Sequence, residues 1–96
     1  MLPTVVDFES TAAFKKDLAG APANIRQAAT DALKTLKTNI SSRALRCHTL
    51  KGYKKPTIYK IDVDGPAWQV TFEMDGTTAR LLRLGTHKEI DRAPRR

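Results

Sequence analysis

The chain has 96 residues, with 17 Lys or Arg against 10 Asp or Glu, and a net charge of +7. Its single cysteine excludes an internal disulfide, and its apolar runs are too short to span a bilayer. We therefore expect one domain, residues 1–96, in the cytoplasm and without a membrane partner. The positive charge favours polyanionic partners such as nucleic acid, because no acid lies between Asp31 and Asp62 while eight bases do.

The first 39 residues predict a strand followed by two helices. Residues 4–9 ("TVVDFE") are rich in β-branched side chains and suit a strand. Ser10 or Thr11 then caps a helix that runs through Ala19. A second helix begins at Pro22 or Asn24 and ends near residue 39. Its apolar residues fall at helical spacing and predict a buried stripe: Ile25, Ala28, Ala29, Ala32, Leu33 and Leu36.

Residues 40–56 have no clean period and carry most of the basic run, so we predict a structured loop. After it the period changes to two. Three strands are expected at 57–64, 68–74 and 78–85, with turns at Gly65-Pro66 and Asp75-Gly76. In the last strand Leu82 and Leu84 are expected on one face and Leu81 on the other, as in a strand covered on both sides.

The predicted order is β-α-α-β-β-β. It indicates an α+β domain in which a helical hairpin packs on one face of a mainly antiparallel sheet. The other face is expected to present a mixed polar surface, cupped by the basic loop. Its residues are Lys60, Asp62, Gln69, Thr71 and Glu73.

His87 is the main candidate for chemistry, because it follows the last strand directly. Residues i and i+4 of a regular strand point the same way, so Arg83 is expected on the same side. A neutral imidazole can take a proton from a ribose 2′-hydroxyl, and an imidazolium can return one to a leaving oxygen. Arg83 and Lys60 can stabilise charge on the phosphate. The alternative is that His87 is only a polar loop residue.

A second group of residues is expected to contact nucleic acid. His48 either contacts phosphate, acts as a second acid or base, or is a plain loop residue. Trp68 either stacks on a base or completes the core face of its strand. A zinc site of Cys47, His48 and His87 lacks the usual ligand spacing, so we expect no metal and no cofactor. The full set of expected nucleic-acid contacts is Arg46, His48, Lys51, Lys54, Lys55, Trp68 and Lys88.

The segments "LKGYKKPTIYKIDV", "WQVTFEMDG" and "LLRLGTHKEID" resemble the RelE/ParE superfamily of small bacterial toxins. The resemblance covers nearly the whole chain. It implies the toxin of a type II toxin–antitoxin system, held in check by a cognate antitoxin. Members of the RelE type are metal-free endoribonucleases, or mRNA interferases, which inhibit translation by cutting messages on the ribosome. Members of the ParE type instead poison DNA gyrase.

The resemblance also implies roles for single residues. Lys60 matches a catalytic lysine of the family, and "GTH" places His87 at the position that one subgroup uses as acid or base, with Arg83 fitting the same subgroup. Asp62 and Gln69 depart from the basic residues that many members have there. Three functions therefore stay open: an mRNA interferase, a gyrase poison, or a toxin-fold protein that has lost activity and only binds antitoxin or RNA.

Overall fold

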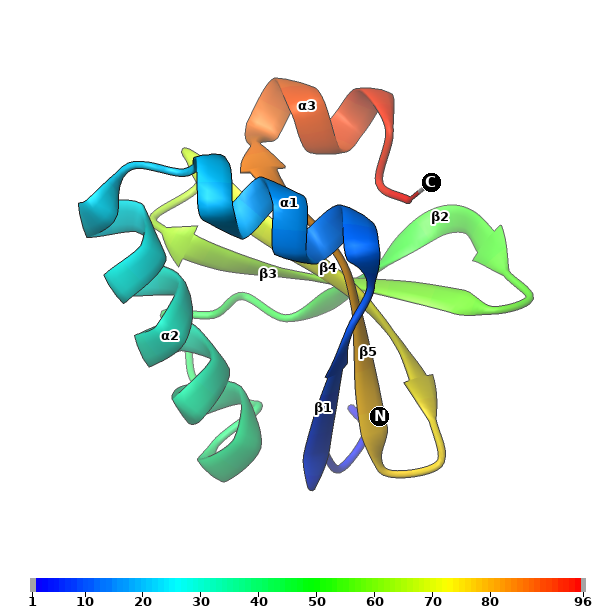
Figure 1. Ribbon diagram of the computed structural model, residues 1–96. Helices are drawn as coiled ribbons and strands as arrows, with labels where there is room; N and C mark the ends of the chain where they lie inside the picture. The colour runs from blue at the N-terminus through cyan, green and yellow to red at the C-terminus, as the bar shows by residue number, and fades with distance from the viewer. Residues whose placement is uncertain (1, 96) are drawn as a thin grey trace.

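Five strands form one sheet, in the order β1-β5-β4-β3-β2. The computed structural model describes residues 2–95, apart from the side chain of residue 54. β1 pairs with β5 in parallel, and all other neighbours are antiparallel. Figure 1 shows the elements, which are β1 (Asp7–Ser10), α1 (Ala12–Gly20), α2 (Ala23–Thr38), β2 (His48–Lys54), β3 (Thr57–Asp64), β4 (Trp68–Asp75), β5 (Thr78–Thr86) and α3 (His87–Arg92).

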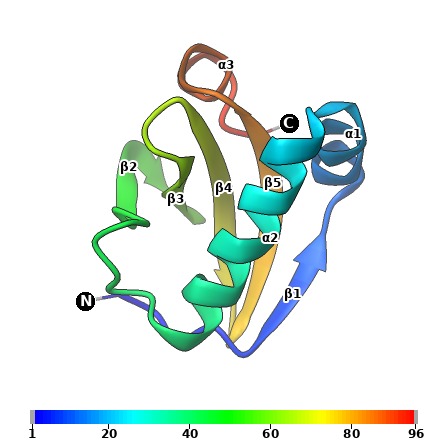
Figure 2. The same cartoon turned by 90° about the vertical axis from the view of Figure 1, so that its left-hand side faces the viewer.

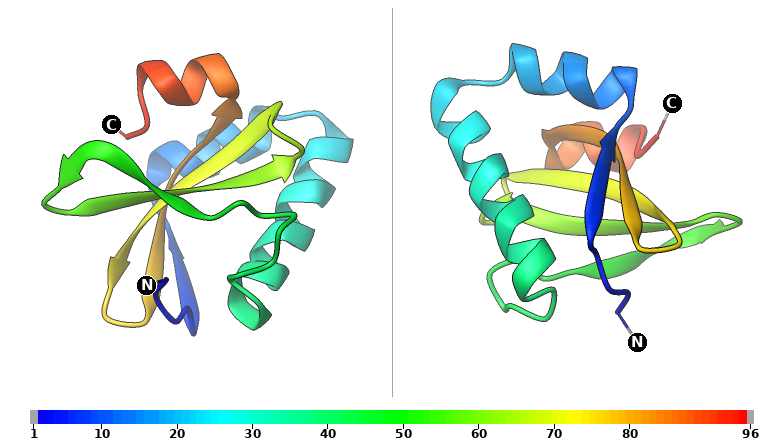
Figure 3. Two further views of the ribbon diagram at one scale, coloured as in Figure 1. Left: turned by 180° about the vertical axis from the view of Figure 1, so that it is seen from behind. Right: turned by 60° about the horizontal axis from the view of Figure 1, so that its bottom comes forward.

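The sheet and the two long helices confirm the predicted α+β fold class. Thr11 caps α1 by accepting a hydrogen bond from the Phe14 N–H, and α2 follows Pro22 directly. In Figure 2, α2 stands in front of the sheet, and the left view of Figure 3 shows the molecule from behind relative to Figure 1. None of the helices in residues 2–95 is long and apolar enough to cross a bilayer.

The core lies between the helices and one face of the sheet. The predicted stripe of α2 is confirmed, since Ile25, Ala29, Ala32 and Leu36 are buried. The core-facing alternation of β3 and β4 is confirmed as well. The buried cluster includes Phe14, Ile25, Leu36, Ile61, Val70, Phe72, Leu81 and Leu84, with Tyr59, Val63, Trp68 and Met74 packed against it.

Two predicted boundaries were wrong. The first strand begins at Asp7 rather than residue 4, although Val5 before it is buried. Residues 40–56 hold a strand, β2, where we expected only a loop. Its pairing with β3 shifts register between Thr49 and Lys54, and Gly52 has a φ of 87°. These irregularities break the alternation that reveals a strand in a sequence.

A bulge changes the predicted faces of β5. Phe72 pairs with Leu81, whereas the preceding residue of β4 pairs with Arg83, so Leu82 has no direct partner. Such an extra residue reverses the alternation beyond it. Leu81 and Leu84 therefore share the core face, and the prediction that Leu82 and Leu84 share one was wrong. The expectation that β5 is covered on both sides is confirmed by the burial of residues 81–85.

Candidate functional site

One row of polar side chains crosses four strands on the face away from α2. His48 pairs with Lys60, Lys60 with Thr71, and Thr71 with Arg83. Directly paired residues of antiparallel strands point to the same face of a sheet. We call these four residues the polar row. The expected open surface was wrong here, because Lys60, Thr71 and Arg83 are at most 7% exposed. The residues after α3 cover part of the row: the Thr71 hydroxyl donates to the Pro94 carbonyl at 2.6 Å, and Arg83 Nη1 donates to the Ala93 carbonyl.

Lys60 is a nearly buried cation in the middle of the polar row. Among residues 2–95, no carboxylate pairs with its ammonium group. The neighbouring Asp62 is occupied elsewhere, since it accepts from Gln69 Nε2 at 3.3 Å and lies 3.8 Å from Arg46 Nε. Buried charges are usually paired. The ammonium group of Lys60 is therefore available to bind an anion that enters the polar row.

Arg83 is fixed by Asp17 of α1. Its Nε donates to Asp17 Oδ2 at 2.6 Å and its Nη2 to Asp17 Oδ1 at 3.2 Å. The same carboxylate accepts from the Leu84 N–H, which has no strand beside it because β1 ends at Ser10, opposite Leu81. The hydrogen bonds that Arg83 donates to Asp17 raise the pKa of Arg83 above its ordinary value. The third guanidinium nitrogen, Nη1, makes no hydrogen bond to Asp17 and remains on the face of the sheet that carries the polar row.

His87 begins a helix, α3, that we did not predict from the sequence. Thr86 and Glu89 form a capping box: the Thr86 hydroxyl accepts from the Glu89 N–H, and the Glu89 carboxylate accepts from the Thr86 N–H at 2.9 Å. These hydrogen bonds lower the pKa of Glu89 below its ordinary value. The His87 N–H donates to the Ala67 carbonyl, and its ring Nε2 lies 3.0 Å from Asp91 Oδ2. The His87 side chain is exposed at the start of α3.

The structure does not place His87 in the polar row. Thr86 pairs with Trp68, whereas Arg83 pairs with Thr71, three positions further along β4. At about 3.3 Å per residue, Thr86, the residue before His87, already lies about 10 Å along β5 from Arg83 of the row. The expectation that Arg83 and His87 share a side required only a strand that is regular to Gly85, and β5 meets that condition. However, β5 ends at Thr86 and the chain turns into α3.

Gly85→Ala should loosen the start of α3. A Cβ at residue 85 would lie 3.2 Å from Glu89 Cβ and 3.4 Å from its Oε1, so the Glu89 side chain that caps α3 has to move by a few tenths of an ångström. Because overpacking and loss of a cap each cost about 1 kcal/mol or more, we expect the free energy of unfolding to fall by about 1–3 kcal/mol. Urea denaturation followed by fluorescence measures this.

Gly20→Ala is the matched control. A Cβ there meets no atom within 4 Å, and residue 20 lies at the end of α1. Alanine also restricts the unfolded chain more than glycine does. We expect unchanged or slightly higher stability. Equal destabilisation by both substitutions would contradict the role given to the Gly85–Glu89 contact.

Trp68 lines a pocket beside the start of α3. The pocket has a volume of about 250 Å³, and its walls include Lys16 and Gly20 of α1 together with Glu89. Trp68 also packs against the main core, so its ring has both a buried and an accessible part. The structure therefore agrees with the core interpretation of Trp68 and leaves an accessible edge beside α3.

Most of the expected nucleic-acid contacts gather on one edge of the sheet. Arg46, His48, Lys51 and Lys55 are exposed and lie on or beside β2, the edge strand seen at the front of Figure 3, left. The His48 Nδ1 lies 2.7 Å from the Arg46 carbonyl oxygen. Lys54 belongs to the same strand, but its side chain lies outside the described part of the structure. Lys88 is exposed in α3. Lysines on an edge strand also prevent pairing with other chains, which is the structural alternative.

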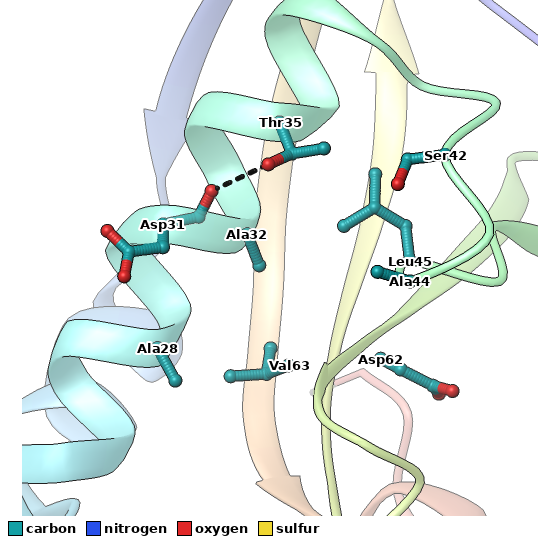
Figure 4. Close-up of a pocket in the computed structure, with 9 residues that line it drawn as sticks. All are labelled: Ala28, Asp31, Ala32, Thr35, Ser42, Ala44, Leu45, Asp62 and Val63. Atoms are coloured by element: carbon teal, nitrogen blue, oxygen red, sulfur yellow. Dashed lines mark hydrogen bonds between the residues drawn. The ribbon is translucent and has the colours of Figure 1, made fainter.

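A second pocket, of about 280 Å³, lies between α2 and the segment before β2 (Figure 4). Small and apolar side chains line it, among them Ala28, Ala32, Leu45 and Val63. Figure 4 shows the Asp62 carboxylate directed away from Val63 and from α2. The pocket therefore opens on the helix side of β3 and shares no side chain of the polar row.

Cys47 is half-buried, and burial raises the pKa of its thiol to about 11. The thiol is therefore protonated at neutral pH and is a poor nucleophile. Within residues 2–95, no three His, Cys, Asp or Glu side chains come together in a way that could hold a metal ion.

Solved structures with the same architecture are toxins. The RelE of a RelB–RelE antitoxin–toxin complex from Methanococcus jannaschii matches with a TM-score of 0.67 and 26% identity, over 91% of this chain and 96% of that one. The Escherichia coli DinJ–YafQ toxin–antitoxin complex gives a TM-score of 0.71 and 22% identity, over 88% and 94%. A free E. coli RelE mutant gives 0.69 and 13%, over 92% and 90%. No protein-family model and no curated protein sequence matches the chain.

The chain has the RelE-like fold. The predicted resemblance to the RelE/ParE superfamily is thus confirmed for the fold, across most of the chain. Within this fold, residues that sequence reasoning had not singled out hold the site: Asp17, Asp91 and the segment after α3. The Thr86-x-x-Glu89 pattern was a readable signal for α3. Asp17 had no such signal, because it meets Arg83 only through the tertiary fold.

Proposed function

We propose that the chain is the toxin of a type II toxin–antitoxin system and acts as a metal-free, ribosome-dependent mRNA interferase. The observation that supports this most is a RelE-like fold in which an exposed histidine, His87, stands at the start of α3. In the same fold Lys60, which pairs with no carboxylate among residues 2–95, lies in the polar row. The net charge of +7 agrees with a ribosomal and RNA target.

His87 is the proposed acid or base. The carboxylate of Asp91 only accepts hydrogen bonds, so the Nε2 of His87 donates and Nδ1 carries the lone pair of the neutral ring. Nδ1 takes the proton of the ribose 2′-hydroxyl as its oxygen attacks phosphorus. The bond from phosphorus to the 5′-oxygen breaks, and that oxygen receives a proton from a second donor. The products are a 2′,3′-cyclic phosphate and a 5′-hydroxyl.

His48 is proposed to contact a phosphate, since it lies in the polar row three strand spacings across the sheet from Arg83 and away from His87. Its Nδ1 donates to the Arg46 carbonyl, because a carbonyl oxygen only accepts. Its Nε2 is therefore free at the exposed end of the polar row. Lys60 and Arg83 follow in that row and stabilise charge on phosphate oxygens. Because Thr86, next to His87, already lies about 10 Å along β5 from Arg83, we assign these cations to the RNA strand next to the cut.

The remaining basic residues are proposed to bind ribosomal RNA and the message backbone. Arg46, Lys51, Lys54 and Lys55 would do this from the edge at β2, Lys88 would do so from α3, and the accessible edge of Trp68 would stack on a base. The inhibitor of the chain is proposed to be a cognate antitoxin. Relatives of this fold have been crystallised with the antitoxins RelB and DinJ.

Induced expression in bacteria tests this function against gyrase poisoning. Pulse labels for protein and DNA synthesis are followed after induction, with His87→Gln as the comparison. We expect protein synthesis to stop first, with cleaved messages, and the His87→Gln protein to be harmless. Gyrase trapped on DNA with an SOS response while translation continues would favour the ParE-like alternative. A folded protein that stops neither process would favour the inactive toxin fold, the alternative that Gln69 and Asp62 in place of basic residues keep open.

A further inference from the structure

The C-terminal tail, residues 93–95, runs back across the polar face of the sheet. The Pro94 carbonyl accepts from the Thr71 hydroxyl at 2.6 Å, and the Ala93 carbonyl accepts from Arg83 Nη1 at 3.3 Å. The Arg95 guanidinium lies over the ring of Tyr53 on β2, at 5.2 Å from its centroid. In Figure 1 the tail descends from α3 toward the β2–β3 hairpin. The tail therefore contacts the sheet at three places, one each on β5, β4 and β2.

The Ala93 and Pro94 carbonyls accept hydrogen bonds from two donors that are also suited to bind a phosphate. The Asp17 carboxylate accepts hydrogen bonds from the Nε and Nη2 of Arg83. The remaining guanidinium nitrogen, Arg83 Nη1, donates to the Ala93 carbonyl of the tail. The Thr71 hydroxyl belongs to a fully buried side chain, and Lys60 next to it in the row pairs with no carboxylate among residues 2–95. A hydroxyl, a guanidinium N–H and an ammonium in one row are the donor set that phosphate oxygens accept from.

We infer that Thr71 and Arg83 Nη1, with Lys60, form a receptor for an RNA phosphate that the C-terminal tail fills in the free protein. The tail carbonyls stand in for phosphate oxygens, because both present acceptors only. The tail must leave before RNA enters, so it lowers the affinity of the free protein for RNA. This inference rests on the proposed function for its ligand, but it concerns binding and not cleavage.

Removal of residues 93–96 tests the inference, because two explanations predict opposite changes in the affinity for RNA. The deletion takes away two arginines, and simple electrostatics predicts weaker RNA binding. Loss of the competing carbonyls predicts tighter binding, by about tenfold, the equivalent of one or two hydrogen bonds. The probe is a short fluorescent RNA with 2′-O-methyl riboses, which cannot be cut, and the readout is anisotropy without ribosomes.

Thr71→Val in the shortened protein identifies the receptor. Valine keeps the shape of threonine and removes the hydroxyl, so affinity should return toward that of the full chain. Thr77→Val is the control, since Thr77 is exposed in the turn between β4 and β5. It should leave the affinity unchanged.

Pro94→Gly provides a version that keeps both arginines. Glycine loosens the tail without shortening it, so we expect tighter binding in this variant too. Thermal unfolding verifies that each variant folds. Unchanged or weaker binding in both the deletion and Pro94→Gly, or equal loss from Thr71→Val and Thr77→Val, overturns the inference. Tighter binding of a protein that never cuts messages would keep the inference and reject the proposed nuclease.

Discussion

Asp17→Ala should lower the free energy of unfolding by about 3–5 kcal/mol, because removal of one partner leaves the other charge buried. Arg83 is 8% exposed and keeps its charge, so it would lose both hydrogen bonds to the carboxylate. The Leu84 N–H at the open edge of β5 would lose its acceptor as well. Urea denaturation measures the change, and we expect no intermediate to obscure it in a domain of this size.

Two comparisons make this result specific. Asp31→Ala changes an exposed carboxylate of α2 that accepts a hydrogen bond from Gln27, and it should cost less than about 0.5 kcal/mol. The double change Asp17→Leu with Arg83→Met removes both charges together. It should cost less than Asp17→Ala, because apolar replacement of a buried pair is close to neutral. A cost for Asp17→Ala as small as that of Asp31→Ala would show that the pair is not buried in solution.

His87→Ala should slow message cleavage on the ribosome by about 10²–10⁴-fold, the usual contribution of a general acid or base. The substitution removes a side chain from the exposed surface of α3, whose buried anchor is Ile90, so folding should be preserved. The rate is measured in single-turnover reactions with programmed ribosomes. Thermal unfolding of the same variant confirms that the loss is not structural.

Imidazole in the buffer separates a proton carrier from a binding residue. A small imidazole can enter the space left by His87→Ala and carry the proton, so part of the lost rate should return. Asp91→Asn, which keeps the shape of the partner of His87, should give a smaller loss than His87→Ala and no response to imidazole. Full activity of His87→Ala would contradict the acid–base role outright.

The regular elements of this fold follow from local patterns. Two patterns predicted which faces are buried: the period-two alternation of β3 and β4, and the apolar stripe of α2. Caps at Thr11 and Pro22 marked where the helices begin. Each of these signals lies within a few residues, so one sequence is enough to find it.

The arrangement of the site residues depends on tertiary contacts, which no local sequence pattern reveals. Arg83 and Asp17 are 66 residues apart, and their pairing follows from where β1 ends along β5. The bulge at Leu82 altered the faces of β5, and the irregular register of β2 hid a strand. The polar face was predicted to be open because its cover, the tail at Pro94, is identified only by tertiary contact. Residue types were thus predictable, but their surroundings were not.

Cleavage of messages on purified ribosomes tests the central claim most directly. An end-labelled mRNA is bound to ribosomes and treated with the wild-type chain or His87→Ala, with EDTA-treated protein and ribosome-free RNA as parallel reactions. The account predicts a single cut within the ribosome-bound codon, a 2′,3′-cyclic phosphate at the new end, and no cut by His87→Ala or without ribosomes. Intact mRNA with the folded wild-type chain, or equal cutting by His87→Ala, would contradict it.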